Sequence, residues 1–304
     1  MKRRELLQRS ATLGLFAAIP FPAVSTLSTA GAHSNNSPLK ASPLTPPAQG
    51  SIPVAFLISD GAVVIDFCGP WEVFQDVDVP GRTDDPFHLY TVSESTKPIQ
   101  TSAGMKIIPD HTFQTAPQPK VIVIPAQHAR SSATLDWVRK STKSADVTMS
   151  VCTGAFLLAS TGLLSGKEAT THHASFKSFA KAFPDIQLKR GARFVESGNL
   201  ATAGGLSSGI DLALRVVERY FGGEVATQTA FQMEYQGQGW KNPDSNEVYA
   251  KSRISTADHP LCQVCEMDVD PKLAPKSVVA GKAYYFCSPE HKTEFDAAPA
   301  KYVD

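Results

Sequence analysis

The chain has 304 residues, and its 29 Lys and Arg residues balance 29 Asp and Glu residues, so the formal net charge at pH 7 is zero. This length suffices for one or two domains with buried cores. An apolar fraction of 42% is ordinary for a globular protein. Because the balanced charge leaves no electrostatic footprint for nucleic acid, we expect no nucleic-acid partner.

The first 32 residues are typical of an export signal. Arg3-Arg4 precedes the mostly apolar stretch 11–27, and Ala30-Gly31-Ala32 fits the small-residue cleavage rule. The apolar stretch is short and interrupted by prolines, so a lasting membrane anchor is the less favoured interpretation. Arg3-Arg4-x-Leu-Leu resembles a twin-arginine signal. We therefore expect a periplasmic or secreted protein with no stable membrane anchor after cleavage.

Residues 33–51 are rich in Pro, Ser and Asn and predict a flexible linker. Residues 52–237 follow as one α/β domain, because strand and helix signals alternate through them. Continuous apolar strands with helices between them indicate a mainly parallel sheet covered on both faces. The expected strands are 52–58, 87–92, 105–108, 121–124 and 147–151, with a hairpin in 188–199. The expected helices open at Gly69-Pro70 and cover 131–143 (capped by Ser131 or Ser132), 153–161, 174–183, 207–220 and 224–235.

Cys152 lies between the apolar strand 147–151 and a helix that begins at about Gly154. The tight turn between them places the sulfur at the helix N-terminus, where unpaired N–H groups and the helix dipole favour a thiolate. This is the cysteine form of a strand–nucleophile–helix elbow. It indicates a catalytic or redox-active thiol, with a buried structural cysteine as the alternative.

Three segments are predicted to meet at the carboxyl edge of the sheet. Asp66 lies in the turn after the first strand, Ala126-Gln127 after the central strand and Cys152 after the next one. Sites in open parallel sheets form at this edge. We therefore expect a small-molecule site there.

The C-terminal residues predict a metal site. C-x-x-C at Cys262 and Cys265, with C-x-x-x-H at Cys287 and His291, supplies four soft or borderline ligands for one zinc or copper ion. A module at 259–304, after a linker at 238–258, can hardly bury a stable core alone, and a metal would close it. The alternative is a disulfide, Cys262–Cys265 or Cys265–Cys287.

Four ordered blocks of the chain, 64–74, 151–159, 169–172 and 202–214, carry a shared pattern. Together they resemble the ThiJ/PfpI family of the class I glutamine-amidotransferase-like superfamily. D-x-x-G-P and C-T-G look most like its isonitrile hydratase branch, and also like the sensor domains of AraC-type regulators. The resemblance implies a flavodoxin-like, doubly wound fold, pairing as a homodimer, a small-molecule substrate and no cofactor in this domain.

The resemblance assigns roles to Asp66, Cys152 and Thr153. The Cys152 thiolate would attack an isonitrile carbon, or a reactive aldehyde, and Asp66 would supply or hold a proton beside the sulfur. The Thr153 hydroxyl would orient the water that releases an N-substituted formamide. Backbone N–H groups near Ala126, Gln127 and Thr153 would bind developing negative charge. His172 would accept a proton near Cys152, or is instead a partly buried histidine bonded to backbone.

This chain departs from the family pattern at three places. Ala126-Gln127 stands where the family usually has Gly-Gly, and His173 stands where relatives often carry Trp. Cys68 is expected to be a packing residue, although a disulfide with Cys152 would silence the nucleophile. These departures leave the substrate open.

The C-terminal stretch 262–302 resembles the YHS domain, a small heavy-metal-binding module, which implies the same four ligands. Two functions remain open. One is an exported cysteine-dependent hydratase or lyase. The other is a non-enzymatic, periplasmic metal-handling or redox-sensing protein in which Cys152 is oxidised reversibly.

Overall fold

A computed structural model describes residues 41–251, 254–256 and 258–303. The expected export signal at 1–32 and the first part of the expected linker lie outside the described residues.

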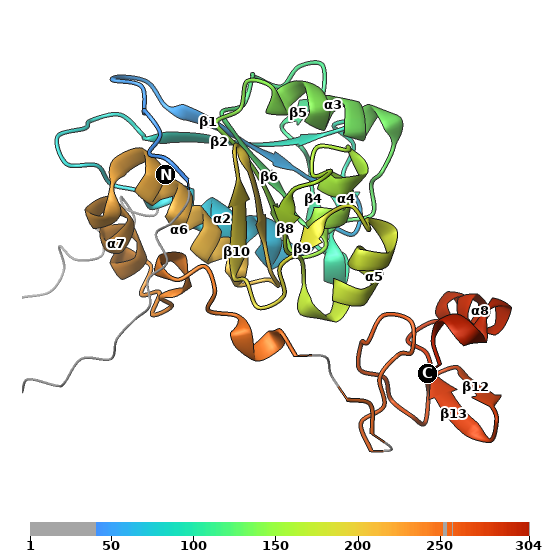
Figure 1. The fold of residues 1–304 in the computed structure, drawn as a ribbon. Coiled ribbons are helices and arrows are strands. Elements are labelled where there is room, and N and C mark those ends of the chain that lie inside the picture. Colours follow the sequence, from blue (N-terminus) through green and yellow to red (C-terminus); the bar gives the residue numbers. More distant parts are fainter. Residues whose placement is uncertain (1–40, 252–253, 257, 304) are drawn as a thin grey trace, which may run out of the picture. The chain divides into compact units, whose positions relative to one another are not determined.

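The centre of the molecule is a seven-stranded sheet with strand order β10-β11-β7-β6-β1-β2-β5 (Figure 1). Every neighbouring pair is parallel except the β10–β11 hairpin. The mainly parallel sheet predicted from the apolar strands is therefore confirmed. Its strands are β1 (Ile52–Leu57), β2 (Phe87–Ser93), β5 (His111–Thr112), β6 (Val121–Ile124), β7 (Val147–Val151), β10 (Phe194–Ser197) and β11 (Leu200–Ala203).

Helices cover both faces of the sheet, and the two-residue period of the strands sorts their side chains between two cores. In β1, Val54 and Phe56 pack in one buried cluster, whereas Ala55 and Leu57 pack in the other. The first cluster is completed by α2 (Val64–Gln75), α6 (Ser208–Phe221) and α7 (Gly223–Gln232). The second is completed by α3 (Ser132–Thr142), α4 (Gly154–Ser160) and α5 (Phe176–Ala182).

Short elements complete the main domain. Two further ladders pair β3 (Ile99–Gln100) with β4 (Lys106–Ile107) and β8 (Glu168–Ala169) with β9 (Gln187–Leu188). The 3-10 turns here are η1 (Ser102–Gly104), η2 (His173–Ser175), η3 (Gly239–Lys241) and η4 (Glu247–Tyr249).

Two predicted boundaries were wrong. The first helix begins at Val64 rather than Gly69, so Pro70 lies inside it and Asp66 lies in its first turn. Pro70 lacks an N–H, which removes one bond of the helix without ending it. The predicted hairpin lies at 194–203 rather than 188–199, with its turn at Gly198 (φ 66°).

Parts of both predicted linkers are packed. The Ala41 and Ser42 carbonyls accept hydrogen bonds from Arg215 (3.3 Å) and Arg219 (3.0 Å) on α6. Trp240 is only 2% exposed, and its backbone N–H donates to Asp211 Oδ1 at 2.9 Å. Residues 239–249 therefore cover the main domain instead of spanning open solvent.

The C-terminal module contains a hairpin of β12 (Lys276–Val279) and β13 (Lys282–Tyr285), the helix α8 (Pro289–Ala297) and the turn η5 (Pro299–Lys301). Its small core includes Phe286 and Phe295, which are fully buried. This agrees with the predicted small α+β module.

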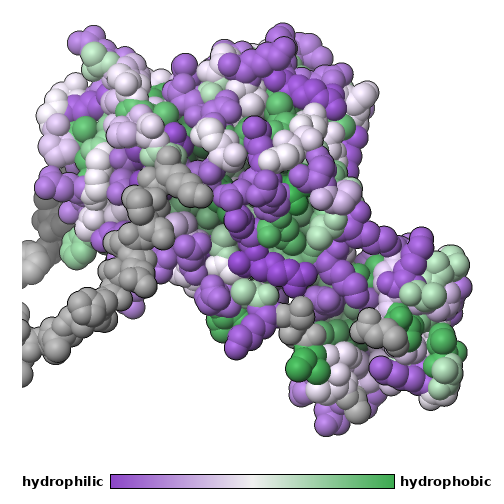
Figure 2. Space-filling view, in the orientation of Figure 1, coloured by the Kyte–Doolittle hydropathy of each residue, from purple (hydrophilic) through white to green (hydrophobic). Residues whose placement is uncertain are grey.

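The surface shown in Figure 2 is largely hydrophilic, with hydrophobic residues in small groups. Among the described residues, no helix has the length and apolar character needed to cross a membrane.

Candidate active site and metal cluster

Cys152 lies in the turn between β7 and α4 with a φ of 57°. A non-glycine residue in this left-handed region is strained by about 1–2 kcal/mol. The turn is tight because α4 begins against the end of β6, where a Cβ on Gly154 would lie 2.2 Å from the Ile124 carbonyl oxygen. The sequence C-T-G therefore builds a nucleophile elbow of the predicted kind.

Three groups donate hydrogen bonds to the Cys152 sulfur: the Thr153 N–H, the Thr153 hydroxyl and the Leu206 N–H. They do not ionise it. Burial, reinforced by the negative charge of Asp66, raises the pKa of the Cys152 thiol to about 12. The predicted resting thiolate was wrong, because desolvation outweighs the donors at the helix N-terminus. The residue as a whole is buried, with 8% of its surface exposed.

Asp66 is fully buried, and burial raises the pKa of its carboxyl to about 6 although a hydrogen bond from the Ala126 N–H opposes the shift. Oδ2 accepts that bond at 3.1 Å, while Oδ1 is buried and has no protein partner. The Asp66 charge in turn raises the pKa of the Cys152 thiol, so the two groups lie close enough to interact electrostatically.

The turn after β6 differs from the prediction. The Ala126 N–H is occupied by Asp66, so it is not a free donor for developing negative charge. The Gln127 side chain donates from Nε2 to the Leu57 carbonyl at 2.9 Å, which anchors the turn to β1. Among the predicted donors, Thr153 is the one that lies at the Cys152 sulfur.

Leu206 is a site residue that the sequence analysis missed. Its φ is 45°, and its backbone N–H reaches the Cys152 sulfur from the loop between β11 and α6. A backbone donor has no side-chain signature. The sequence hint of a tight loop here is the Gly204-Gly205 pair before Leu206. The structure explains the second glycine, because a Cβ on Gly205 would lie 2.4 Å from the His172 ring.

His172 lies beside this loop, and its Nδ1 accepts a hydrogen bond from the Ala174 N–H at 3.3 Å. Burial, with a contribution from His173, lowers the pKa of His172, which favours the neutral ring. In the neutral ring with Nδ1 as acceptor, Nε2 carries the proton. This geometry favours the backbone-bonded interpretation over a proton acceptor for Cys152.

Thr171 fixes the elbow from the same side, because its hydroxyl donates to the Cys152 carbonyl at 2.9 Å. Cys68 is half-buried on α2 and packs against the core that contains Cys152. Cys68 and Cys152 are both free thiols. Burial and the nearby Glu72 carboxylate raise the pKa of Cys68.

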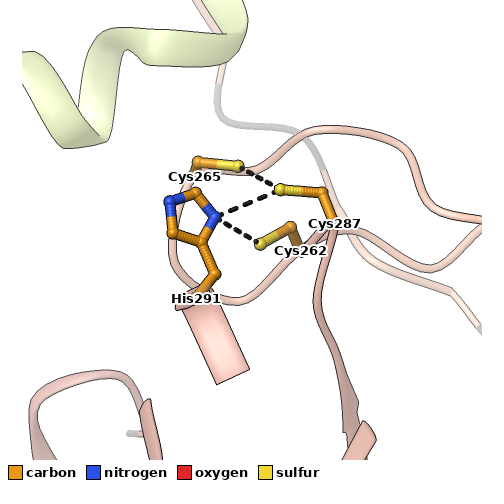
Figure 3. Close-up of side chains that lie close together, drawn as sticks. All are labelled: Cys262, Cys265, Cys287 and His291. Atoms are coloured by element: carbon orange, nitrogen blue, oxygen red, sulfur yellow. Dashed lines mark hydrogen bonds between the residues drawn. The ribbon is translucent and has the colours of Figure 1, made fainter. Parts of the chain in front are cut away.

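The predicted metal ligands meet in the C-terminal module. The ligand atoms of Cys262, Cys265, Cys287 and His291 all lie within 4.8 Å of one another. Nδ1 of His291 points toward two sulfurs, at 3.1 Å from Cys287 and 3.5 Å from Cys262 (Figure 3). The Cys265 and Cys287 sulfurs are 3.5 Å apart, far beyond the roughly 2.05 Å of a disulfide.

This donor set fits a tetrahedral metal ion. Zinc–sulfur bonds of about 2.3 Å imply sulfur–sulfur separations of about 3.8 Å, close to the Cys265–Cys287 distance of 3.5 Å. A hydrogen bond from Cys265 lowers the pKa of Cys262, and the same interaction raises the pKa of Cys265. The cluster therefore already favours one thiolate, and a cation would be needed to ionise the others.

Comparison with known proteins identifies the family to which the main domain belongs. The model of the DJ-1/PfpI family matches residues 53–219, which include Asp66, Cys152 and the Leu206 loop. The chain belongs to the DJ-1/PfpI family. The match ends before the Cys/His cluster, so it does not test the resemblance to a YHS domain.

Among curated relatives, isonitrile hydratase of Pseudomonas putida is 32% identical over 61% of this chain and 79% of its own length. The HTH-type transcriptional regulator CdhR of Pseudomonas aeruginosa is 24% identical over 69% of this chain and 62% of the regulator. The curated relatives of this chain thus include both an enzyme and a transcriptional regulator.

Two solved structures support the fold. A ThiJ/PfpI family protein from Pseudomonas syringae is 27% identical, with a TM-score of 0.55 over 62% of this chain and 77% of that one. Drosophila melanogaster DJ-1beta, at 19% identity, gives a TM-score of 0.54 over 62% of this chain and 100% of that one, and shows the fold alone. The predicted flavodoxin-like α/β fold is confirmed.

Proposed function

We propose that the main domain hydrates isonitriles to N-substituted formamides, with Cys152 as the nucleophile and Asp66 as the proton relay. The observation that carries this proposal is the buried pair of a strained, hydrogen-bonded thiol and a carboxyl with a pKa of about 6. The named activity of the Pseudomonas putida relative supports it.

The first step uses the resting protonation states. Near pH 7 most Asp66 carboxyls are ionised and the Cys152 thiol is protonated. Asp66 accepts the thiol proton and delivers it to the terminal carbon of R–N≡C, while the sulfur bonds to that carbon. The product is the thioimidate R–N=CH–S–Cys152. The unpartnered Oδ1 of Asp66 is the suitable relay atom, because Oδ2 is held by Ala126.

The second step consumes one water. The water oxygen bonds to the thioimidate carbon and a proton moves to nitrogen, which gives R–NH–CH(OH)–S–Cys152. Collapse of this adduct breaks the C–S bond, releases R–NH–CHO and returns the hydroxyl proton to the sulfur. The Thr153 hydroxyl orients the water, and the Thr153 and Leu206 N–H groups stabilise the departing sulfur.

The test is formamide production from phenyl isonitrile by the purified full chain, followed by mass spectrometry in H₂¹⁸O. We expect one ¹⁸O in the product and no turnover by Cys152→Ala. Cys68→Ala is the matched control, since Cys68 is a free thiol on α2, outside the turn between β7 and α4. No turnover by the wild-type chain, or full turnover by Cys152→Ala, contradicts the proposal.

For the C-terminal module we propose a YHS-type domain that binds one zinc or copper ion through Cys262, Cys265, Cys287 and His291. The convergence of these four side chains supports it. We also propose export through the twin-arginine signal and pairing as a homodimer. Export is tested by expressing the full chain in a bacterial host. We expect the host to cleave off residues 1–32 and the mature chain to be recovered outside the cytoplasm. Sedimentation of that chain tests pairing.

A second function for the whole chain is favoured by the metal cluster: a non-enzymatic protein that handles heavy metals or senses redox state through Cys152. Tight metal binding combined with no turnover of any isonitrile supports this function. Conversion of Cys152 to a sulfenic or sulfinic acid by peroxide, faster than that of Cys68, would further support it.

A further inference from the structure

We propose that a cavity beside the Cys152 turn holds the substituent of the substrate, that this substituent is an uncharged single ring, and that Tyr249 determines specificity for it. This inference rests on the proposed function for the reacting end of the substrate. The cavity is lined by residues of the segments 171–176 and 205–207, by Arg193, and by Asn246 and Tyr249.

The cavity adjoins the sulfur through two of its lining residues. Leu206 lines it and donates its N–H to the Cys152 sulfur. Thr171 lines it and donates its hydroxyl to the Cys152 carbonyl at 2.9 Å. A molecule bound there would therefore present its end to the nucleophile.

The cavity has the size and wall of a ring-binding site. Its volume is about 180 Å³, which is enough for a single ring, and its lining combines polar side chains with aromatic ones. The rings of His173 and Tyr249 are stacked, with centroids 5.0 Å apart and planes 24° from parallel. Phe176 adds a third ring to the lining. A flat ring fits such a wall by stacking.

Among the described residues that line the cavity, Arg193 carries the only guanidinium group, and the charge of that group is already neutralised. Arg193 donates from Nε to Asp211 Oδ2 at 2.7 Å, and Asp211 is fully buried. Its remaining groups bond Asn246 Oδ1 at 3.2 Å and the Ser207 hydroxyl at 3.0 Å. An arginine committed in this way is a poor anchor for an anionic ligand, so the cavity favours a neutral one.

Tyr249 lies outside the family match, which ends at residue 219. Two contacts fix the segment that carries Tyr249. The backbone N–H of the buried Trp240 donates to Asp211, and Arg193 donates to Asn246. One wall of the cavity therefore lies outside the part of the chain that the family model matches. We assign the choice of substituent to this wall.

The experiment measures binding of the uncharged product N-phenylformamide to the full chain by titration calorimetry. We expect Tyr249→Ala to weaken binding by about 3- to 10-fold, the loss of one aromatic stacking contact. Tyr249→Phe and the neighbouring Val248→Ala, whose side chain is 77% exposed, should bind as the wild type does. N-methylformamide, which lacks the ring, should not distinguish the variants.

Equal binding of N-phenylformamide by the wild type and Tyr249→Ala overturns the assignment. Equally tight binding of N-(4-carboxyphenyl)formamide overturns the neutral-ligand part. The proposed reaction is judged separately: Tyr249-dependent binding without turnover of phenyl isonitrile leaves the cavity assignment standing and removes the reaction. Turnover that Tyr249→Ala leaves unchanged in KM and kcat keeps the reaction and removes the assignment.

Discussion

The carboxyl of Asp66 and the thiol of Cys152 are both buried, and the negative charge of Asp66 makes ionisation of the thiol more costly. The carboxyl comes from the first turn of α2 and the thiol from the turn before α4, two segments that meet at the carboxyl edge of the sheet. Such a pair holds the thiol proton near a buried carboxylate that can accept it. This property suits the addition of a thiol across an unsaturated carbon, and it has measurable consequences.

Asp66→Asn should stabilise the protein at neutral pH while abolishing turnover. The folded-state pKa of Asp66, about 6, lies above its ordinary 3.8, so folding favours the protonated carboxyl. Its contribution to stability is fully present below pH 3.8 and is lost as the pH rises through 6. An amide stays neutral, so we expect a gain of about 1–3 kcal/mol at pH 7.5. Urea unfolding at pH 7.5 and pH 4 measures it.

The gain should shrink toward pH 4, because the wild-type carboxyl is then protonated as well. Asp85→Asn changes an exposed carboxyl and serves as the control, with little effect at either pH. A variant that is less stable than the wild type at pH 7.5 would show that the Asp66 charge is not costly in the fold.

Alkylation of Cys152 by iodoacetamide should be slow at pH 8 and should accelerate as the pH rises further. With its pKa raised to about 12, only about one thiol in ten thousand is ionised at pH 8. Asp66→Asn removes the negative charge that contributes to this shift, so it should speed the alkylation. Peptide mass spectrometry distinguishes Cys152 from the other cysteines. Rapid modification below pH 7 that saturates by pH 8 would instead reveal a preformed thiolate.

Local sequence patterns predicted most of the fold because they depend on local physics. The alternation of Val54 and Phe56 with Ala55 and Leu57 reflects a strand buried on two faces. The expected cap of α3 is also present, since the Ser131 hydroxyl accepts the Thr134 N–H at 3.1 Å.

The features that the sequence did not predict have a different origin, because they depend on tertiary contacts. The burial of Trp240 against α6 turns part of a polar, glycine-containing stretch into a wall of the domain. The ionisation of Cys152 depends on the desolvation around it, which no spacing of residues encodes. The Leu206 donor belongs to the backbone and would be the same with many other side chains at that position.

The C-terminal cluster should bind one zinc ion per chain, and loss of one ligand should weaken that binding at least tenfold. His291→Ala removes the nitrogen that faces Cys262 and Cys287. Structural zinc sites contribute to folding, so a chelator should also lower the midpoint of thermal unfolding of the module. Competition with a chromophoric chelator measures the affinity. His259→Ala, an exposed histidine of the same module outside the cluster, should match the wild type. Equal affinity in the two variants would place the metal elsewhere.

Gly154→Ala should damage the elbow more than any change in charge nearby. A Cβ at this position would meet the Ile124 carbonyl oxygen at 2.2 Å and the Pro125 carbonyl oxygen at 2.8 Å, both backbone atoms that cannot swing away. We expect a loss of about 1–3 kcal/mol in the free energy of unfolding, since the strand and helix must move apart. Gly223→Ala, in the first turn of α7 with its nearest neighbour at 3.7 Å, is the matched control and should change stability little. Chemical unfolding followed by tryptophan fluorescence measures both variants. If Gly154→Ala keeps wild-type stability, the close approach of α4 to β6 that holds Cys152 in its strained turn does not exist in solution.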